Sequence, residues 1–154
     1  MKILGIGDSF MMPCDDKTVT LYMREVANKL NADYEVIGMP GTSPWHAFFK
    51  FLDYKNKNEL NVVVFAWSEA TRLYHHTGIP LNMGTALDDA RPSIRIKNDE
   101  DIYNAAKQYY LHLFDYKKAG YEALGLYYVI DDISKQYSNI KFIHMYCFRS
   151  EEHT

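Results

Sequence analysis

The segment of residues 61–67, Asn-Val-Val-Val-Phe-Ala-Trp, constrains the fold of this chain more than any other, because an uninterrupted apolar run follows Asn61. A short run rich in β-branched residues predicts a strand that is covered on both faces, as in the centre of a parallel sheet. Residues 2–7, 34–38 and 140–148 are further short segments rich in apolar residues, and we expect each of them to form a strand. Because parallel strands need long crossover connections, helices are expected between them.

Two stretches between these strands have the spacing or the start signals of a helix. Residues 18–30 carry a single helical stripe, formed by Val19, Met23, Val26 and Leu30. A second helix is expected to begin at Pro44, with Ser43 as its cap.

The stretch of residues 99–137 is helical in composition. It carries two stripes, Ile102, Ala106, Tyr109 and Leu113 in the first and Leu126, Ile130, Ile133 and Tyr137 in the second. Gly120 and Gly125 predict a break between two helices, and residues 73–98 show no period, which is typical of a lid or a binding loop. The order of elements predicts one domain over residues 1–154, a three-layer α/β/α sandwich with a doubly wound parallel sheet of flavodoxin-like order.

Composition narrows the expected partners. The chain has 17 lysines and arginines against 20 aspartates and glutamates, a net charge of −3 without a basic cluster, so neither nucleic acid nor membrane is expected as a partner. No apolar run is long enough for a transmembrane helix, and a cytoplasmic location is expected. Cys14 and Cys147 imply neither a disulfide framework nor a zinc site, and we expect no metal and no cofactor.

Three polar segments follow three predicted strands. They are residues 7–9 (Gly-Asp-Ser), residues 40–43 (Pro-Gly-Thr-Ser) and residues 67–69 (Trp-Ser-Glu). The carboxyl ends of parallel strands share one edge of the sheet, where ligands bind in open α/β folds. A serine at this edge can serve as an exposed nucleophile, and Asp8 is expected to cap N–H groups of the turn that carries Ser9.

These segments resemble the SGNH (GDSL-like) hydrolase family. Gly7, Asp8 and Ser9 match the first family block, and Gly41 resembles the glycine of the second block. The resemblance implies a serine esterase that cleaves an ester of a small molecule, lipid or carbohydrate, with Ser9 as the nucleophile. It also implies an oxyanion hole built from the N–H groups of Ser9 and Gly41.

The chain departs from the family pattern in two places. Residues 66–69 replace the third block, Gly-x-Asn-Asp, so Ser68 is the expected third oxyanion donor and Glu69 is expected to pair with Arg72. The C-terminal Asp-x-x-His block is missing, because His153 has no aspartate three residues before it.

The missing block leaves the general base open. The candidates are His153, His75 and His76, and adjacent histidines in an extended segment are expected to point to opposite faces. The end of the chain soon after a strand favours a truncated protein over a natural non-catalytic relative. The alternative function is a catalytically inactive SGNH-like module that binds a ligand or a partner.

Three further expectations concern a nucleotide site, a histidine and the last predicted strand. A nucleotide or flavin site is disfavoured, because Phe10 stands where a dinucleotide fingerprint needs its third glycine. His144 is expected to be a satisfied core histidine. The last predicted strand, if left as an edge of the sheet, predicts a homodimer.

Overall fold

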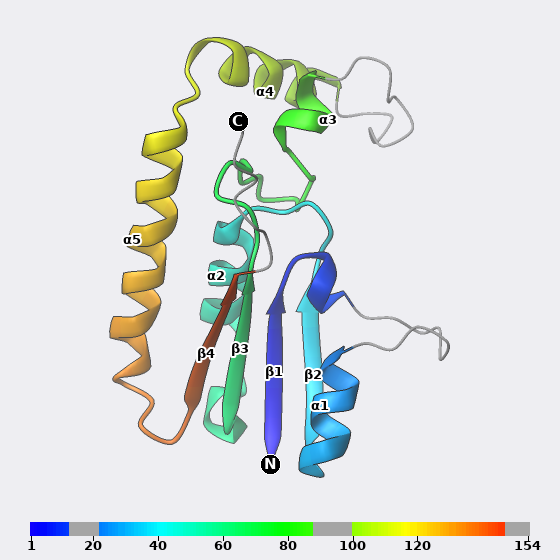
Figure 1. Ribbon diagram of the computed structural model, residues 1–154, viewed down its shortest axis with the longest axis vertical. Helices are drawn as coiled ribbons and strands as arrows, with labels where there is room; N and C mark the ends of the chain where they lie inside the picture. Colours follow the sequence, from blue (N-terminus) through cyan, green and yellow to red (C-terminus); the bar gives the residue numbers. More distant parts are fainter. Residues whose placement is uncertain (13–21, 88–99, 147–154) are drawn as a thin grey trace, which may run out of the picture.

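The computed structural model describes residues 1–12, 22–87 and 100–146. The chain has an α/β fold around a four-stranded sheet, in which every strand is parallel to its neighbours and the order is β2-β1-β3-β4 (Figure 1). The strands are β1 (Lys2–Gly7), β2 (Asp33–Gly38), β3 (Val62–Trp67) and β4 (Lys141–Tyr146). All four predicted strands are therefore confirmed, and β3 is buried from Val63 to Trp67 as its apolar run predicts.

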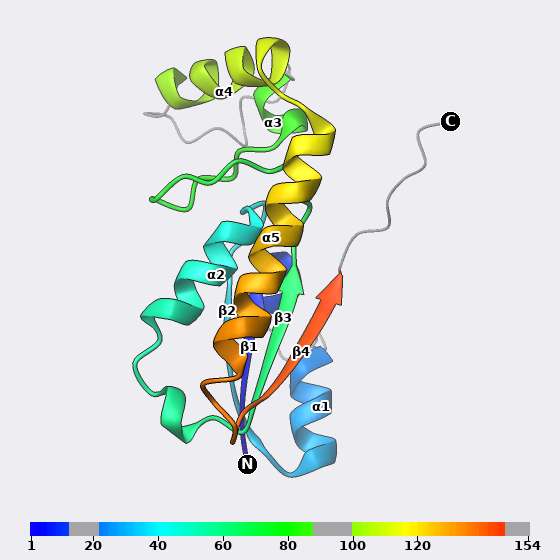
Figure 2. The ribbon, with the colours of Figure 1, turned by 90° about the vertical axis from the view of Figure 1, so that its left-hand side faces the viewer.

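Helices cover both faces of the sheet. Helix α1 (Tyr22–Leu30) lies on one face, and α2 (Pro44–Asp53) and α5 (Tyr116–Ser134) lie on the other (Figure 2). This layering is compatible with the predicted α/β/α sandwich. Two more helices, the short α3 (Met83–Leu87) and the longer α4 (Glu100–His112), lie beyond the carboxyl ends of the strands (Figure 1).

Two hydrophobic clusters hold the helices on the sheet. The larger one lies between the sheet and helices α2 and α5, where the Phe65 ring stacks on Trp67 at 4.7 Å and meets Phe51 edge-on at 5.5 Å. The predicted stripe of Leu126 and Ile130 faces this cluster. The second cluster lies between the sheet and α1 and includes Ile3, Met11 and Met23. Burial of apolar surface in these clusters supplies most of the favourable free energy of folding.

The predicted break within residues 99–137 is misplaced. The chain leaves the helical conformation between His112 and Tyr116, and both Gly120 and Gly125 lie inside α5. Asp115 caps the new helix, because its carboxylate accepts a hydrogen bond of 2.6 Å from the Lys118 N–H. The cap and the two glycines have effects of similar size on the helix, so the helix continues through the glycines because the buried face of α5, with Ala119, Ala123, Leu126 and Ile130, packs against the rest of the protein.

A third cluster explains why the predicted stripe of α4 is also wrong in part. Helices α3 and α4 pack on each other around Tyr103, Ala106 and Tyr110 instead of packing on the sheet. Leu113, which the stripe assigned to the core, follows α4 and is 71 % exposed. The segment predicted as a loop contains α3 and an antiparallel bridge between Leu73 and Leu81.

Two details of the helix predictions differ from the structure. Ser43 precedes α2 as expected, but its hydroxyl makes no capping hydrogen bond. Leu30 is exposed at the end of α1, where Met23 and Ala27 are the buried residues. Val19, Cys14 and Cys147 lie outside the described residues.

Strand β4 is an edge of the sheet in the part of the chain that the structure describes. Ile143, Met145 and Tyr146 are exposed along it. The homodimer that such an edge predicts stays a prediction. None of the helices in the described ranges has the length and hydropathy needed to cross a membrane.

Candidate functional site at the carboxyl edge of the sheet

The segments that follow β1 and β2 pack closely together. The Met39 N–H donates to the Gly7 carbonyl at 3.4 Å. A side chain at Gly38 would overlap the backbone carbonyls of Asp8 and Met11, so only glycine lets the two segments approach this closely. This glycine requirement has no local signature in the sequence, because it depends on a contact between β2 and the turn that follows β1.

Ser9 lies at the carboxyl end of β1, as the sequence predicts. It is the first residue of a short 3-10 helix, η1 (Ser9–Met11), and its side chain is exposed. Asp8 caps this helix, because its Oδ1 accepts a hydrogen bond of 3.1 Å from the Phe10 N–H. The predicted turn-forming role of Asp8 is confirmed.

Asp8 has a second partner that local sequence reasoning missed. Its side chain is completely buried, and its Oδ2 accepts a hydrogen bond of 3.3 Å from Arg72, whose side chain is 11 % exposed. Arg72 also lies 3.8 Å from Glu69, as expected. The ion pair ties the turn after β1 to the loop after β3. The sequence signal for this ion pair was an aspartate and an arginine that each follow a predicted strand.

Gly41 lies in the left-handed region of the backbone, with a φ of +75°. A Cβ at this position would come within 2.6 Å of the Pro80 Cβ, so the glycine is needed for its conformation and for a close approach. Within the described residues, the Gly41 N–H donates to no backbone carbonyl.

Ser68 follows β3 and is 6 % exposed. Its hydroxyl is buried and finds no hydrogen-bond partner among the described residues. Because a buried hydroxyl without a partner costs free energy, such a group is typical of a site that waits for a ligand or a water molecule.

The candidate bases differ from one another. The rings of His75 and His76 contact each other with centroids 4.4 Å apart, so the expectation that they point to opposite faces is wrong, because the segment turns here. His75 bonds to the Thr77 hydroxyl through Nδ1 at 2.7 Å. In the described ranges neither ring is hydrogen-bonded to Ser9, and His153 lies outside those ranges.

His46 is buried, and His144 is partly buried on the edge strand β4. His144 Nδ1 accepts a hydrogen bond of 2.9 Å from the Trp67 indole, but Nε2 finds no hydrogen-bond partner among the described residues and lies 3.3 Å from Asp131, so the expected satisfied core histidine is met only in part. Burial lowers the pKa of His144, although nearby Asp131 acts in the opposite direction. Burial, aided by the charge of Lys50, also lowers the pKa of His46. Both rings therefore favour the neutral form.

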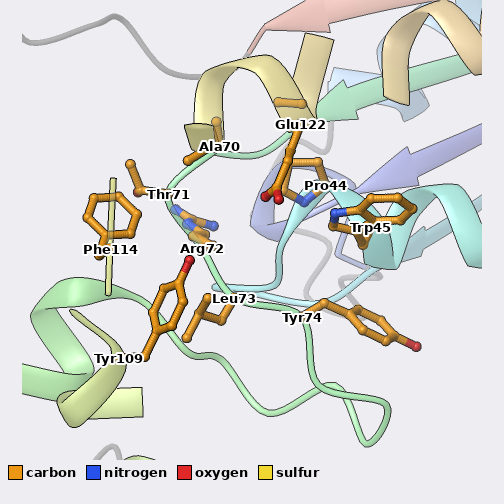
Figure 3. Close-up of a pocket in the computed structure, with 12 residues that line it drawn as sticks. Pro44, Trp45, Ala70, Thr71, Arg72, Leu73, Tyr74, Tyr109, Phe114 and Glu122 are labelled. Carbon is orange, nitrogen blue, oxygen red and sulfur yellow. The ribbon is translucent and has the colours of Figure 1, made fainter. Parts of the chain in front are cut away.

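A pocket of about 140 Å³ lies beside this edge, between the loop after β3 and three helices (Figure 3). The loop contributes residues 70–74, and α2 contributes Pro44 and Trp45. Tyr109 of α4 and Glu122 of α5 complete the opposite wall. Arg72 belongs both to this pocket and to the ion pair with Asp8, so the pocket adjoins the Ser9 turn through a shared residue.

The tyrosine below this pocket shows how α4 is held in place. The Tyr110 hydroxyl donates to the carbonyls of Thr71 and Leu81, at 2.8 and 3.1 Å. Burial strongly raises the pKa of this phenol, so it stays a donor. Helix α4 is therefore tied directly to the loop that carries Arg72.

Within the described ranges, no three histidine, cysteine, aspartate or glutamate side chains form a group that could hold a metal ion. No protein-family model matches the chain, and no curated protein is similar enough to match it.

Proposed function

We propose that the protein is a serine hydrolase of the SGNH type that cleaves an ester through an acyl-enzyme on Ser9. The observation that carries this proposal is the exposed Ser9 at the carboxyl end of β1, on a turn that buried Asp8 and Arg72 hold in place. A rigid turn supports catalysis because it keeps a nucleophile oriented toward its target. As part of the same proposal, we infer that the fold is flavodoxin-like.

The reaction has two steps. The Ser9 oxygen forms a bond to the acyl carbon while a base accepts its proton, and the ester C–O bond then breaks to release the alcohol. Water then hydrolyses the acyl-serine ester and regenerates the hydroxyl. His75, His76 and His153 remain the candidates for the base.

Three groups support the transition state in this proposal. They are the N–H groups of Ser9 and Gly41 and the hydroxyl of Ser68. In support of this assignment, the Gly41 N–H donates to no described backbone carbonyl, and the buried Ser68 hydroxyl has no partner among the described residues, so neither donor is already committed to another acceptor there. One such preorganised donor contributes roughly 3–4 kcal/mol to the transition state.

Hydrolysis of p-nitrophenyl acetate and p-nitrophenyl butyrate tests the proposal. We expect a Ser9-dependent burst or steady release of p-nitrophenol that Ser9→Ala abolishes. Ser138→Ala is the matched control, because Ser138 is also exposed but lies before β4, at the opposite edge of the sheet. Equal rates in the wild type and in Ser9→Ala would overturn the esterase proposal and favour an inactive module that binds a ligand or partner.

A further inference from the structure

The pocket beside the Ser9 turn combines aromatic rings with polar groups that face it. In Figure 3, Trp45 and Phe114 lie on opposite sides of the loop that carries Arg72. The Tyr109 hydroxyl points toward this loop from α4, and Glu122 projects toward it from α5. Ligand pockets commonly pair apolar walls with a few polar groups of this kind.

The aromatic wall is held in a fixed position. The Trp45 ring stacks on Phe49 at 5.8 Å, and Phe49 contacts Tyr74 at 5.2 Å. Trp45 nevertheless remains 36 % exposed, so part of it is open to a ligand. A ligand that binds this wall does not have to order it first, which lowers the entropic cost of binding.

The charges that line the pocket are already compensated. Arg72 lies 3.3 Å from Asp8 and 3.8 Å from Glu69. The Glu122 carboxylate lies 3.5 Å from the Lys118 ammonium group. A charged ligand would therefore find no uncompensated counter-charge here, which disfavours an ammonium ion or a phosphate.

The remaining candidates differ in polarity. A long acyl chain would displace water from the Glu122 carboxylate and the Tyr109 hydroxyl without replacing the lost hydrogen bonds, at a cost in free energy. A sugar ring is neutral, has apolar C–H groups that pack on an aromatic face, and carries hydroxyls that both donate and accept hydrogen bonds. The volume of about 140 Å³ is below the roughly 300–1,000 Å³ of sites for drug-sized ligands, so it suits one ring.

We infer that this pocket binds a pyranose ring. Its apolar face packs on Trp45, its hydroxyls donate to Glu122, and they exchange hydrogen bonds with Tyr109. The Asp8–Arg72 pair connects this pocket to the Ser9 turn, so the ester that Ser9 cleaves is one carried by a sugar. The identity of the ester as a sugar ester rests on the proposed function, whereas binding of the pyranose ring does not.

Binding is measured on the Ser9→Ala protein, so that no turnover occurs. The chain has two tryptophans, and Trp67 is only 1 % exposed and out of reach of a ligand in solvent. A change in tryptophan fluorescence on addition of a ligand therefore reports binding at Trp45. The probes are methyl pyranosides of glucose, galactose, mannose and N-acetylglucosamine, with tetramethylammonium chloride and sodium hexanoate as the competing classes. We expect a saturable change with at least one pyranoside, and none with the other two probes.

Variants locate the site. Tyr109→Phe and Glu122→Gln should each weaken pyranoside binding about tenfold, because the first removes the phenol hydroxyl and the second replaces a charged acceptor with a neutral amide. Tyr128→Phe and Glu25→Gln are the matched controls, since both side chains are exposed and neither lines the pocket. Urea unfolding of each variant checks that its fold is intact.

Several results would overturn the inference. The first is the absence of a saturable fluorescence change with every pyranoside up to about 100 mM, a concentration at which a lack of binding means negligible affinity. The second is saturable binding of tetramethylammonium or hexanoate instead. The third is pyranoside binding that both pocket variants leave unchanged. Failure of ester hydrolysis in the wild type would leave pyranoside binding intact and would mark the protein as a sugar-binding module.

Discussion

Asp8 and Arg72, 64 residues apart in the chain, form a buried ion pair at 3.3 Å that joins the turn carrying Ser9 to the loop after β3. Burial removes both charges from water, so each depends on the other. The same aspartate caps η1 through its second oxygen. One side chain thus fixes the turn locally and connects it to a neighbouring strand.

Replacing Asp8 tests the strength of this connection. Asp8→Asn keeps the size of the side chain and the acceptor for Phe10 but removes the charge. We expect a loss of roughly 3 kcal/mol in the free energy of unfolding, at the low end for a broken buried pair, because Glu69 still faces Arg72. Urea denaturation measures the loss.

A double-mutant cycle separates this pair from its surroundings. Arg72→Met alone should also destabilise, and the two changes together should cost less than their sum. Lys135→Met is the control, since it removes an exposed pair with Asp132 and should change stability little. Strict additivity of Asp8→Asn and Arg72→Met would show that the two side chains do not interact.

Gly41→Ala tests a backbone requirement. A left-handed φ of +75° costs a residue with a Cβ roughly 1–2 kcal/mol, and the clash with Pro80 adds to this cost. We therefore expect both lower stability and slower ester hydrolysis, because the Gly41 N–H is displaced. Pro80→Gly removes the clashing atom, so the double variant should recover the part of the stability that the clash removes. No loss from Gly41→Ala would contradict the assigned conformation.

Gly120→Ala should have the opposite effect. This glycine lies within α5, and a Cβ there would meet nothing within 4 Å. Alanine favours the helix over glycine by up to about 1 kcal/mol, so thermal and urea unfolding should both show a more stable protein. A destabilised variant would mean that α5 does not continue through this residue.

The start of α5, close to Gly120, shows which features of the fold the sequence could predict and which it could not. Short segments rich in apolar residues predicted all four strands, although only the central strands β1 and β3 are buried along most of their length and the edge strands β2 and β4 are partly exposed. The start of α5 depended on Asp115, a local cap that the glycines at 120 and 125 obscured. The free energy that a helix cap contributes is close to the free energy that a glycine costs inside a helix, and both are smaller than the free energy of packing. Local sequence alone therefore does not decide where the helix begins.

The site was predictable only as separate segments. The sequence placed Ser9, Gly41 and Ser68 after three strands, and shared sheet geometry brought these segments to one edge. The Asp8–Arg72 pair and the wall that Glu122 adds depend on contacts between distant parts of the chain. No local spacing encodes such contacts, because they arise only when the helices pack on the sheet.

Stability should fall as the pH drops through the range below about 6.5, the usual histidine pKa. Burial lowers the pKa of His144 and of His46 in the folded protein, so the unfolded chain binds more protons in this range. The stabilisation is complete above pH 6.5 and is lost as the pH falls toward the lowered folded pKa values. Protonation of His144 would also remove the acceptor for the Trp67 indole.

His144→Gln isolates one of these contributions. Its amide oxygen can still accept from Trp67, but it does not titrate. Urea unfolding at several pH values between about 5.5 and 7.5 should show a shallower loss of stability than in the wild type, and His46→Gln should flatten the profile further. An unchanged slope in the double variant would contradict the assigned direction of both shifts.

The reactivity of Ser9 is most directly measured with a fluorophosphonate probe and intact-mass analysis. An activated serine forms an O–P bond and displaces fluoride, while its proton passes to the base. Ser9-based hydrolysis predicts one adduct on the wild type and on Ser138→Ala, mapped to the peptide that contains Ser9, and none on Ser9→Ala. An unlabelled wild-type protein, or an adduct that persists in Ser9→Ala, would contradict the assignment of Ser9 as the nucleophile.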